Sequence, residues 1–424
     1  MNLELIATVA LFILLFGFIS KRIQKTPLTS TMVFVLFGIL ISKQFLGILD
    51  TDLDSSVIHV IAELTLILVL FTDASRIDLK QVIREHAIPV RLLGIGLPLT
   101  ILFGAIAAFV VFKYLTFWEG ALLAAILAPT DAALGQAVVS NPRVPVRIRQ
   151  SLNIESGLND GIALPVVLIL LSIAGIEDND KTSSYWIRFA AYQVILGPVA
   201  GICVGYFGGK LVEWSSKKKW MSREFQDISA LGLSLLAYSA AELIGGNGFI
   251  AAFTSGLTLG YISKTSCEAL SEFGDAEGQL LTLITFMIFG AFMVLPELGS
   301  LNWQIVIYGL LSLTIIRMVP VALSLTGLGL KPPTILFIGW FGPRGIASIL
   351  FALLILEESG ITHGNEIFTI IMITVLFSVF AHGLTSYPVS ELYAGKFEKL
   401  KDIQEAMVEH QTVKEMPTRI KWKI

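Results

Sequence analysis

The chain has 424 residues, of which 54% are hydrophobic and only 15% are charged, and its mean hydropathy is +0.77. In soluble globular domains about a quarter of the residues are charged, so this composition excludes an ordinary soluble domain. The formal net charge of -3 is by itself uninformative. No nucleic-acid partner is expected. The composition predicts an all-α polytopic membrane protein.

About thirteen apolar segments are long enough to cross roughly 30 Å of hydrocarbon as helices. The first is expected to be a retained helix rather than a signal peptide, because Lys21, Arg22 and Lys25 follow the apolar run instead of preceding it. The predicted spans lie near residues 3–20, 29–48, 56–74, 88–112, 117–139, 147–175, 186–214, 226–244, 247–263, 278–296, 303–326, 333–356 and 366–388.

Lysine and arginine are concentrated in every second loop between these spans, as is typical of cytoplasmic loops. The intervening loops carry acidic residues and few cations, for example Asp50, Asp52 and Asp54. An odd number of spans then places the N-terminus outside and the C-terminus in the cytoplasm. We expect a multi-pass protein of the plasma (inner) membrane, with a transmembrane domain over 1–390 and a short cytoplasmic tail over 391–424 that leaves no room for a large regulatory domain.

Two of the predicted spans are interrupted by proline near their middle. Pro129 interrupts the fifth span and Pro343 the twelfth, and each proline removes a helix hydrogen bond and frees a main-chain carbonyl. The twelfth span follows the fifth at an odd offset of seven, so the two run in opposite directions across the bilayer. Broken spans in corresponding positions predict inverted structural repeats, with two broken crossing helices and an ion site near the midplane. Simple proline kinks are the alternative.

Asp160 is the strongest candidate for the residue that carries the ion. It lies midway along its span, and Ser156 precedes it by one turn on the same helix face. Ionisable groups at membrane depth cost roughly 2.5 to 3.5 kcal/mol on insertion scales, so they occur mainly on ion or proton paths or in pairs. A buried carboxyl can hold either a proton or a hard monovalent cation, which oxygen ligands suit. A structural aspartate bonded to neighbouring helices is the alternative.

Thr130, Asp131 and Asp73 are further candidates for the ion site. Thr130 and Asp131 follow Pro129, where an unwound turn would direct carbonyl and hydroxyl oxygens into a cavity. Their alternative role is that of a polar helix cap. Asp73, near the cytoplasmic end of the third span, either completes the site or lies in the inner funnel. No cofactor is expected. The predicted ligands of the transported monovalent cation are Asp160, Asp131, Thr130 and Ser156.

A buried ion pair is predicted between Glu155 and Arg344. Arg344 is a permanent charge in the middle of an apolar span and needs a partner, for which Glu155 is the obvious candidate. Such a pair would tie two helix systems together without titrating. Asn159 shares a helix face with Glu155, and because it is neutral only one site carboxylate need exchange charge, which favours electroneutral exchange. Arg317 is another intramembrane charge, to which no partner and no transport role are assigned.

Three motifs together resemble the signature stretches of the monovalent cation/proton antiporters. They are Pro129-Thr130-Asp131-Ala132, Glu155-Ser156-Gly157-Leu158-Asn159-Asp160-Gly161 and Gly342-Pro343-Arg344-Gly345. Within that family the Asn159-Asp160 pair is similar to that of the NhaP-type electroneutral sodium/proton exchangers of prokaryotes. The resemblance covers essentially the whole predicted membrane portion.

The resemblance implies a homodimer with a moving core. Dimer-interface helices would lie over about 3–74 and 186–296, and core helices over about 88–175 and 303–388 would move past them in an elevator-like motion. Asp160 would carry the proton and the cation. The resemblance also implies that Asp131, Thr130 and Ser156 surround the ion, that Asn159 supports the site and that Glu155 pairs with Arg344. Some relatives have a glutamate on the third helix where this chain offers only Asp73.

The predicted function is sodium or lithium exchange for protons, by competition at one carboxylate, in pH homeostasis. A potassium/proton exchanger could use the same ligands in a wider cavity, and a passive cation channel would lack obligatory proton countermovement. A membrane-embedded aspartyl protease could use Asp131 and Asp160 as a dyad, but the motifs of such enzymes are missing, so no enzyme activity is predicted. Membrane lipids are the remaining expected partners.

Overall fold

The computed structural model describes residues 3–23, 26–49, 55–77, 82, 87–131, 134–139, 141–175, 183–262, 278–357, 361–398 and 408–410. Over these residues the protein is helical and has no β-strand. Seven of the described helices are long and apolar enough to cross a membrane, and four shorter apolar helices accompany them. The prediction of an all-α polytopic membrane fold is therefore confirmed.

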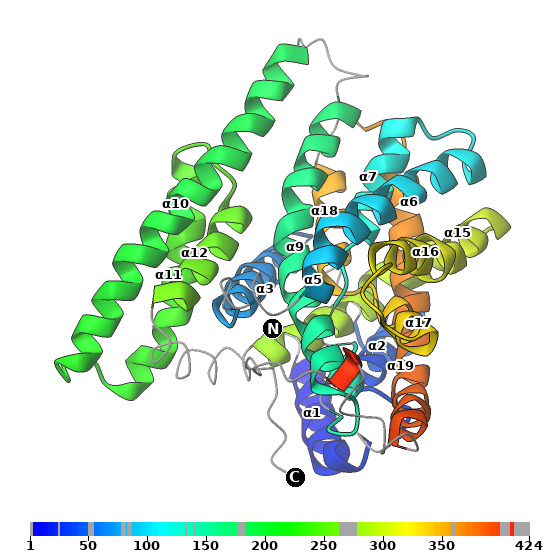
Figure 1. Ribbon diagram of the computed structural model, residues 1–424, viewed down its shortest axis with the longest axis horizontal. Helices are drawn as coiled ribbons and strands as arrows, with labels where there is room; N and C mark the ends of the chain where they lie inside the picture. Colours follow the sequence, from blue (N-terminus) through cyan, green and yellow to red (C-terminus); the bar gives the residue numbers. More distant parts are fainter. Residues whose placement is uncertain are drawn as a thin grey trace.

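The helices follow one another along the chain as coloured in Figure 1. The first half contains α1 (Leu3–Ile23), α2 (Ser30–Ile41), α3 (Ser55–Ser75), α5 (Ala87–Arg91), the π-helical turn η1 (Leu92–Gly96), α6 (Leu97–Val111), α7 (Phe117–Leu127), α8 (Gln136–Val139), α9 (Val146–Ala174) and α10 (Ser183–Lys217). The second half contains α11 (Arg223–Leu243), α12 (Gly248–Ile262), a helix over Gly278–Leu298 that includes the π-helical turn η2 (Phe289–Val294) and α14 (Leu295–Leu298), α15 (Trp303–Leu313), α16 (Ile315–Ser324), α17 (Pro332–Trp340), α18 (Ile346–Glu357), α19 (Gly364–Glu398) and the short turn η4 (Val408–His410).

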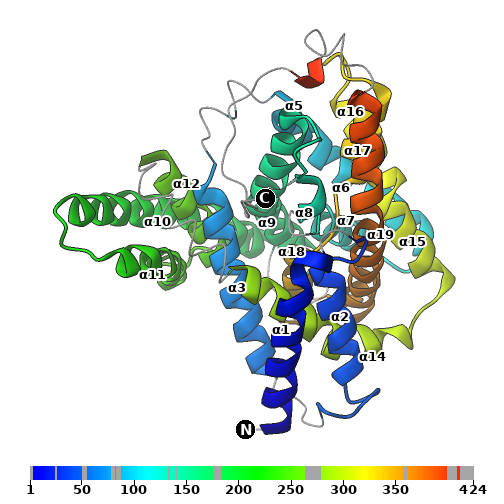
Figure 2. The ribbon, with the colours of Figure 1, turned by 90° about the horizontal axis from the view of Figure 1, so that it is seen from below.

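Helix α9 lies in the middle of the molecule and joins two groups of helices (Figure 1). It packs against α3, α10 and α12 on one side and against α5, α7 and α18 on the other. Figure 2 shows the same division from below, with α10, α11 and α12 set apart from α6, α15, α16, α17 and α19. Residues on α9 are thus placed where they can contact both groups.

Small residues fix α3 against α12 over its last two turns. A Cβ added at Gly256 would overlap the carbonyl oxygen of Phe71, and one at Gly260 would overlap the carbonyl oxygen of Ser75. Helices approach this closely in membranes only where small residues remove the side chains between them. Because Asp73 lies between these two contacts in the sequence of α3, its position relative to α12 is set by this packing.

Both predicted helix breaks are present. In the first, α7 ends at Leu127 and residues 129–131 are not helical. In the second, residues 341–345 form a non-helical segment between α17 and α18. The breaks coincide with Pro129 and Pro343, as expected where the proline ring cannot donate to the helix ladder.

The predicted span over 303–326 is also interrupted, which the sequence did not predict. Thr314 separates α15 from α16 with φ -114° and ψ -96°, far from helical values. The amide of Arg317 then donates to the carbonyl of Thr314 at 3.2 Å. The interruption takes the carbonyl of Ser312 out of the regular helix ladder and makes it available to another donor.

Candidate cation-binding site

The two broken helices meet directly, main chain to main chain. The amide of Asp131 donates to the carbonyl oxygen of Pro343 at 2.8 Å. Oδ2 of Asp131 accepts a hydrogen bond from the amide of Ile346, the first residue of α18, at 3.0 Å. The carboxylate from one broken helix therefore caps the other, at the helix end where the dipole favours a negative charge.

This crossing requires a glycine at position 345. A Cβ added at Gly345 would overlap the carboxylate of Asp131, including Oδ2, which accepts from Ile346. An alanine there has to displace either the carboxylate or the start of α18. Gly345 therefore sets how closely the two breaks approach.

We expect Gly345→Ala to lower cation exchange and to destabilise the fold by about 1–3 kcal/mol, the usual cost of overpacking. Transport in proteoliposomes and thermal unfolding measure the two effects. Gly94→Ala is the matched control, because nothing lies within 4 Å of the place its Cβ would take. Wild-type transport by Gly345→Ala would contradict a tight crossing.

Helix α9 presents a polar face to the crossing. Nδ2 of Asn159 donates to Thr130 twice, to Oγ1 at 2.7 Å and to the carbonyl oxygen at 3.3 Å. The hydroxyl oxygens of Thr130 and Ser156 lie 3.1 Å apart. Asp160 follows Asn159 directly and lies one turn beyond Ser156 on the same helix. The structure thus brings five of the predicted site residues to the first break.

These residues are buried, but not equally. Thr130 and Asn159 are 2% and 1% exposed, whereas Asp131, Ser156 and Asp160 each retain 8%. Among the described residues no donor reaches Oδ1 of Asn159, a buried oxygen. Hydroxyl, carboxylate and amide oxygens are the ligands that hard cations prefer. The arrangement can therefore hold a small cation among oxygens.

The acidic residues of α3 take different positions. A Cβ added at Gly157 would lie 3.9 Å from Cβ of Asp73, so Asp73 lies beside the turn of α9 that holds Ser156. Glu63 accepts a hydrogen bond from the hydroxyl of Tyr238 on α11 instead. That Asp73 binds the cation directly stays a prediction. Glu63 contributes to the contact between α3 and α11.

The buried ion pair of Glu155 is formed with Arg317, and the predicted pairing with Arg344 is corrected. Nη2 of Arg317 lies 2.5 Å from Oε1 of Glu155, and the two side chains are 2% and 3% exposed. A buried charge must be paired, which Glu155 achieves here with a residue of α16. Arg317, to which no partner was assigned, is thus the cation that balances α9.

Arg344 instead donates to main-chain carbonyls at all three helix interruptions. Its Nη1 donates to the carbonyl oxygens of Gly342 at 3.0 Å and Ala128 at 3.3 Å, and its Nη2 donates to that of Ser312 at 3.3 Å. Interrupted helices leave carbonyls without a partner in their own helix, and burying such carbonyls unpaired is costly. Arg344 satisfies these carbonyls and ties the interruptions together.

His382, which was not among the predicted site residues, supports the second break. It is fully buried on α19, and its Nε2 lies 2.9 Å from the carbonyl oxygen of Trp340 at the end of α17. Its Nδ1 lies 3.2 Å from Oγ of Ser378, which accepts from the amide of Arg344 at 2.6 Å. Nδ1 also lies 3.0 Å from the carbonyl oxygen of Ser378, and because both carbonyls are acceptors, the ring nitrogen that carries the proton donates to one of them. His382 therefore holds both sides of the break, and its place four residues after a serine was the available signal.

Glu119 and His363, also absent from the predicted site, fix the beginning of α7. Glu119 forms a capping box with Thr116, and its Oε1 lies 3.0 Å from Nδ1 of His363, just before α19. Glu119 is buried, and its contact with His363 connects the beginning of the broken helix α7 to the beginning of α19. The position of the first break is thus held from both ends of α7.

The fold and the site together define a class of protein. Many apolar helices, two of them broken and crossing at buried carboxylates, are typical of membrane transporters whose substrate binds at the midplane. The profile of the family described as sodium/hydrogen exchanger, transmembrane, matches residues 7–392. The chain belongs to the sodium/hydrogen exchanger family, which is a family of transporters and not of enzymes.

Individual relatives are similar over most of this chain. A K(+)/H(+) antiporter, NhaP, of Alkalimonas amylolytica is 26% identical over 377 residues, which cover 88% of this chain and 63% of that protein. A Na(+)/H(+) antiporter of Saccharomyces cerevisiae is 25% identical over 385 residues, which cover 85% of this chain and 38% of that protein. The chain thus spans less than two thirds of the length of these curated relatives.

A solved structure shares the fold. The sodium proton antiporter of Methanocaldococcus jannaschii matches 93% of this chain and 99% of its own, with a TM-score of 0.75 and 21% sequence identity. The family establishes a multi-pass membrane protein, and this comparison shows that the chain shares the fold of that antiporter.

Proposed function

We propose that this protein exchanges one sodium or lithium ion for one proton across the membrane. The observation that carries the proposal is the meeting of Thr130, Ser156 and Asn159 with the carboxylates Asp131 and Asp160 at the crossing of two broken helices. Such crossings give oxygen ligands to a cation near the midplane. The names of the similar antiporters support the same function.

The coupling follows from the charge balance of the site. Glu155 is neutralised by Arg317, and Asp131 is held by the positive end of α18. Asp160 then needs a proton or a cation before the core can cross, because an uncompensated charge in the membrane is costly. The two ligands compete for one carboxylate, so each binds only when the other has left. Asn159 is neutral and adds no second charge, so the exchange is electroneutral.

Potassium/proton exchange is the second candidate. It is favoured by the name of the relative from Alkalimonas amylolytica. The same oxygens suit a larger ion if they lie further apart around it. Selectivity therefore depends on spacing rather than on the kinds of ligand, and it has to be measured with both ions.

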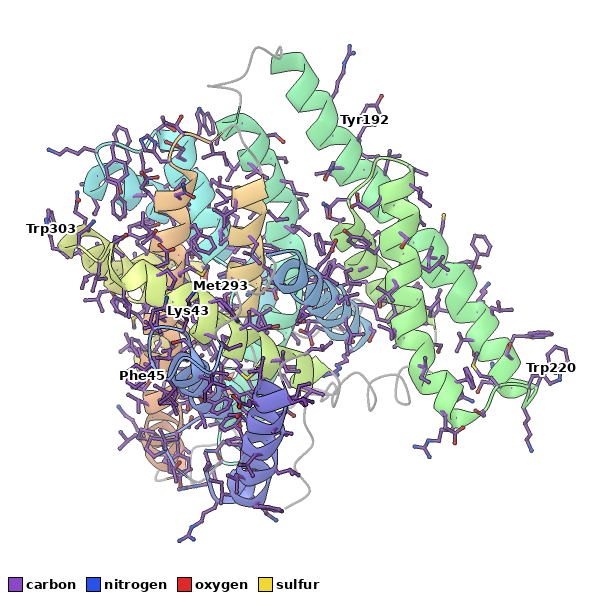
Figure 3. All side chains as sticks on the ribbon, turned by 180° about the vertical axis from the view of Figure 1, so that it is seen from behind. Lys43, Phe45, Tyr192, Trp220, Met293 and Trp303 are labelled. Carbon is purple, nitrogen blue, oxygen red and sulfur yellow. The ribbon has the colours of Figure 1, made fainter. Side chains whose placement is uncertain are left out.

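We further propose a homodimer that works by elevator-type motion, with interface helices over about 3–74 and 186–296 and core helices over about 88–175 and 303–388. The exposed apolar side chains of α10 support this division, since Phe207 is 69% exposed. Tyr192 and Trp220 point away from the molecule near the two ends of this group in Figure 3. The loop charges support a plasma-membrane orientation with the N-terminus outside and the C-terminus in the cytoplasm.

Competition at one carboxylate makes the apparent affinity for sodium depend on pH. We expect the apparent KM for sodium to rise by up to about tenfold for each pH unit below the titration of the site, since protons and sodium bind the same group. Sodium-driven proton movement in proteoliposomes, followed with an internal pH dye, measures it. A KM that is constant over this range would contradict the mechanism.

Two parallel measurements separate the alternatives. Potassium replaces sodium in one, and activity with potassium alone would favour the second candidate. In the other, valinomycin clamps the voltage, and electroneutral exchange is expected to be insensitive to the clamp. A current without proton countermovement would indicate a channel and not an antiporter.

A further inference from the structure

The turn η4 near the end of the chain, red in Figures 1 and 2, is seated against the transmembrane core. It packs against α9, and Val408 joins an apolar cluster that contains Ile148 of α9 and Phe337 of α17. The tail was expected to be a short appendage. A segment of three residues that packs into the core calls for a more specific role.

Glu409 supplies α17 with a cap that the helix itself lacks. Lys331, the N-cap residue of α17, has no side-chain capping bond, and prolines occupy the next two positions. Oε1 of Glu409 accepts from the amide of Lys331 at 2.8 Å and from Oγ1 of Thr334 at 3.1 Å. The residue is only 1% exposed. A carboxylate at this position satisfies a free amide and complements the helix dipole.

The main chain and the apolar side chain of Val408 are recognised as well. Nη1 of Arg147, in the first turn of α9, donates to the carbonyl oxygen of Val408 at 2.5 Å. The same guanidinium attracts the carboxylate of Glu409. Cγ2 of Val408 lies 3.4 Å from the place a Cβ of Gly329 would take. Three features of the tail, a carbonyl, an aliphatic side chain and a carboxylate, thus meet matching groups on the core.

We propose that this surface, the tail seat, is a peptide-binding site for the Val408-Glu409 sequence of the chain's own tail, and that its occupancy tunes cation binding. The tail seat is formed by Arg147, Gly329, Lys331, Thr334 and Tyr393, whose hydroxyl lies 3.0 Å from Oγ1 of Thr334.

The seat reaches the site through two continuous helices. Arg147 begins α9, which carries Ser156, Asn159 and Asp160. Thr334 lies in the first turn of α17, which ends at the break where Pro343 accepts from Asp131. A filled seat fixes the beginnings of the two helices relative to each other. Emptying it lets their far ends, and hence the oxygens around the cation, move relative to each other.

The seating is tested by hydrogen exchange on the full chain. Glu409→Ala is expected to speed exchange of the Lys331 amide by about tenfold, through loss of a charged acceptor. The prolines at 332 and 333 have no amide, which simplifies the reading of a short peptide over 329–335. Glu391→Ala is the matched control. Glu391 lies near the same end of α19 as Tyr393, and its replacement removes a salt bridge to Arg143 but none of the contacts of the tail seat. Unchanged exchange at Lys331 in Glu409→Ala would overturn the proposal.

The tuning rests on the proposed antiport function and is tested separately. The apparent KM for sodium is expected to rise by about threefold or more in Glu409→Ala, and to stay at the wild-type value in Glu391→Ala. Faster exchange at Lys331 with an unchanged KM would reduce the seat to a structural contact and overturn the tuning. Absence of transport in the wild type would refute the antiport function, while hydrogen exchange would still decide whether the tail is seated.

A second variant covers the case in which Glu409→Ala does not fold. Glu409→Gln keeps an oxygen that can accept from Lys331 and Thr334 and loses only the charge that attracts Arg147. It is expected to lie between the wild type and Glu409→Ala in both readouts. If Glu409→Gln matched the wild type in both hydrogen exchange and KM, the negative charge of Glu409 would play no part in binding the tail, which would contradict the proposal.

Discussion

Replacing Asp160 with asparagine is expected to reduce sodium-driven proton movement in proteoliposomes by about 100-fold or more, because the amide can neither take up a proton nor neutralise a cation. The two side chains have nearly the same size, and Asp160 lies on a continuous helix, so the fold should be retained. The measurement is the initial rate of internal pH change after a sodium pulse, compared with wild-type protein reconstituted at the same density.

Binding can be separated from transport in the same variant. A cation that binds only the folded protein stabilises it, so sodium should raise the unfolding temperature of the wild type. This stabilisation should disappear in Asp160→Asn. Loss of transport with sodium stabilisation intact would leave Asp160 as a proton carrier and place the cation elsewhere.

Asp73→Asn is the matched comparison, because it makes the same chemical change on the neighbouring helix α3. Asp73 lies beside Gly157 rather than at the contact of Thr130 with Ser156 and Asn159. We therefore expect it to change the apparent KM for sodium more than the maximal rate. Exchange that survives in Asp160→Asn and vanishes in Asp73→Asn would transfer the carrier role to α3.

The crossing of the broken helices could be predicted because its causes are local. Pro129 and Pro343 remove main-chain donors wherever they stand, so each marks a break without knowledge of the fold. The spacing of Ser156 and Asp160 likewise places both on one helix face whatever surrounds them. The predicted residues Thr130, Asp131 and Ser156 accordingly come together.

The partners of the two buried arginines could not be predicted in the same way. Arg317 and Arg344 are both intramembrane charges, and the sequence does not say which of them faces Glu155. The choice depends on the interruption at Thr314, which no proline marks and which makes the carbonyl of Ser312 available to Arg344. The seating of Glu409 depends on tertiary contacts too, since it joins a distant tail to α17.

Because Glu155 pairs with Arg317, the contribution of this ion pair to stability can be measured. Removing one member of a buried ion pair leaves the other charge uncompensated, at a cost of about 3–5 kcal/mol. We therefore expect Arg317→Met and Glu155→Gln each to lower the unfolding temperature strongly and to reduce the amount of folded transporter. The double variant should be destabilised by less than the sum of the two, because it leaves neither charge unpaired.

A double-mutant cycle on unfolding free energies distinguishes this pairing from the one predicted from the sequence. The coupling between Glu155 and Arg317 should reach about 1–3 kcal/mol, the range for residues in direct contact. Arg344→Met should also destabilise the protein, since it leaves the carbonyls of Ala128 and Gly342 without their donor. Its coupling to Glu155 should be smaller, because its guanidinium is held by carbonyls rather than by the carboxylate. A larger coupling for Glu155 with Arg344 than with Arg317 would reverse the assignment.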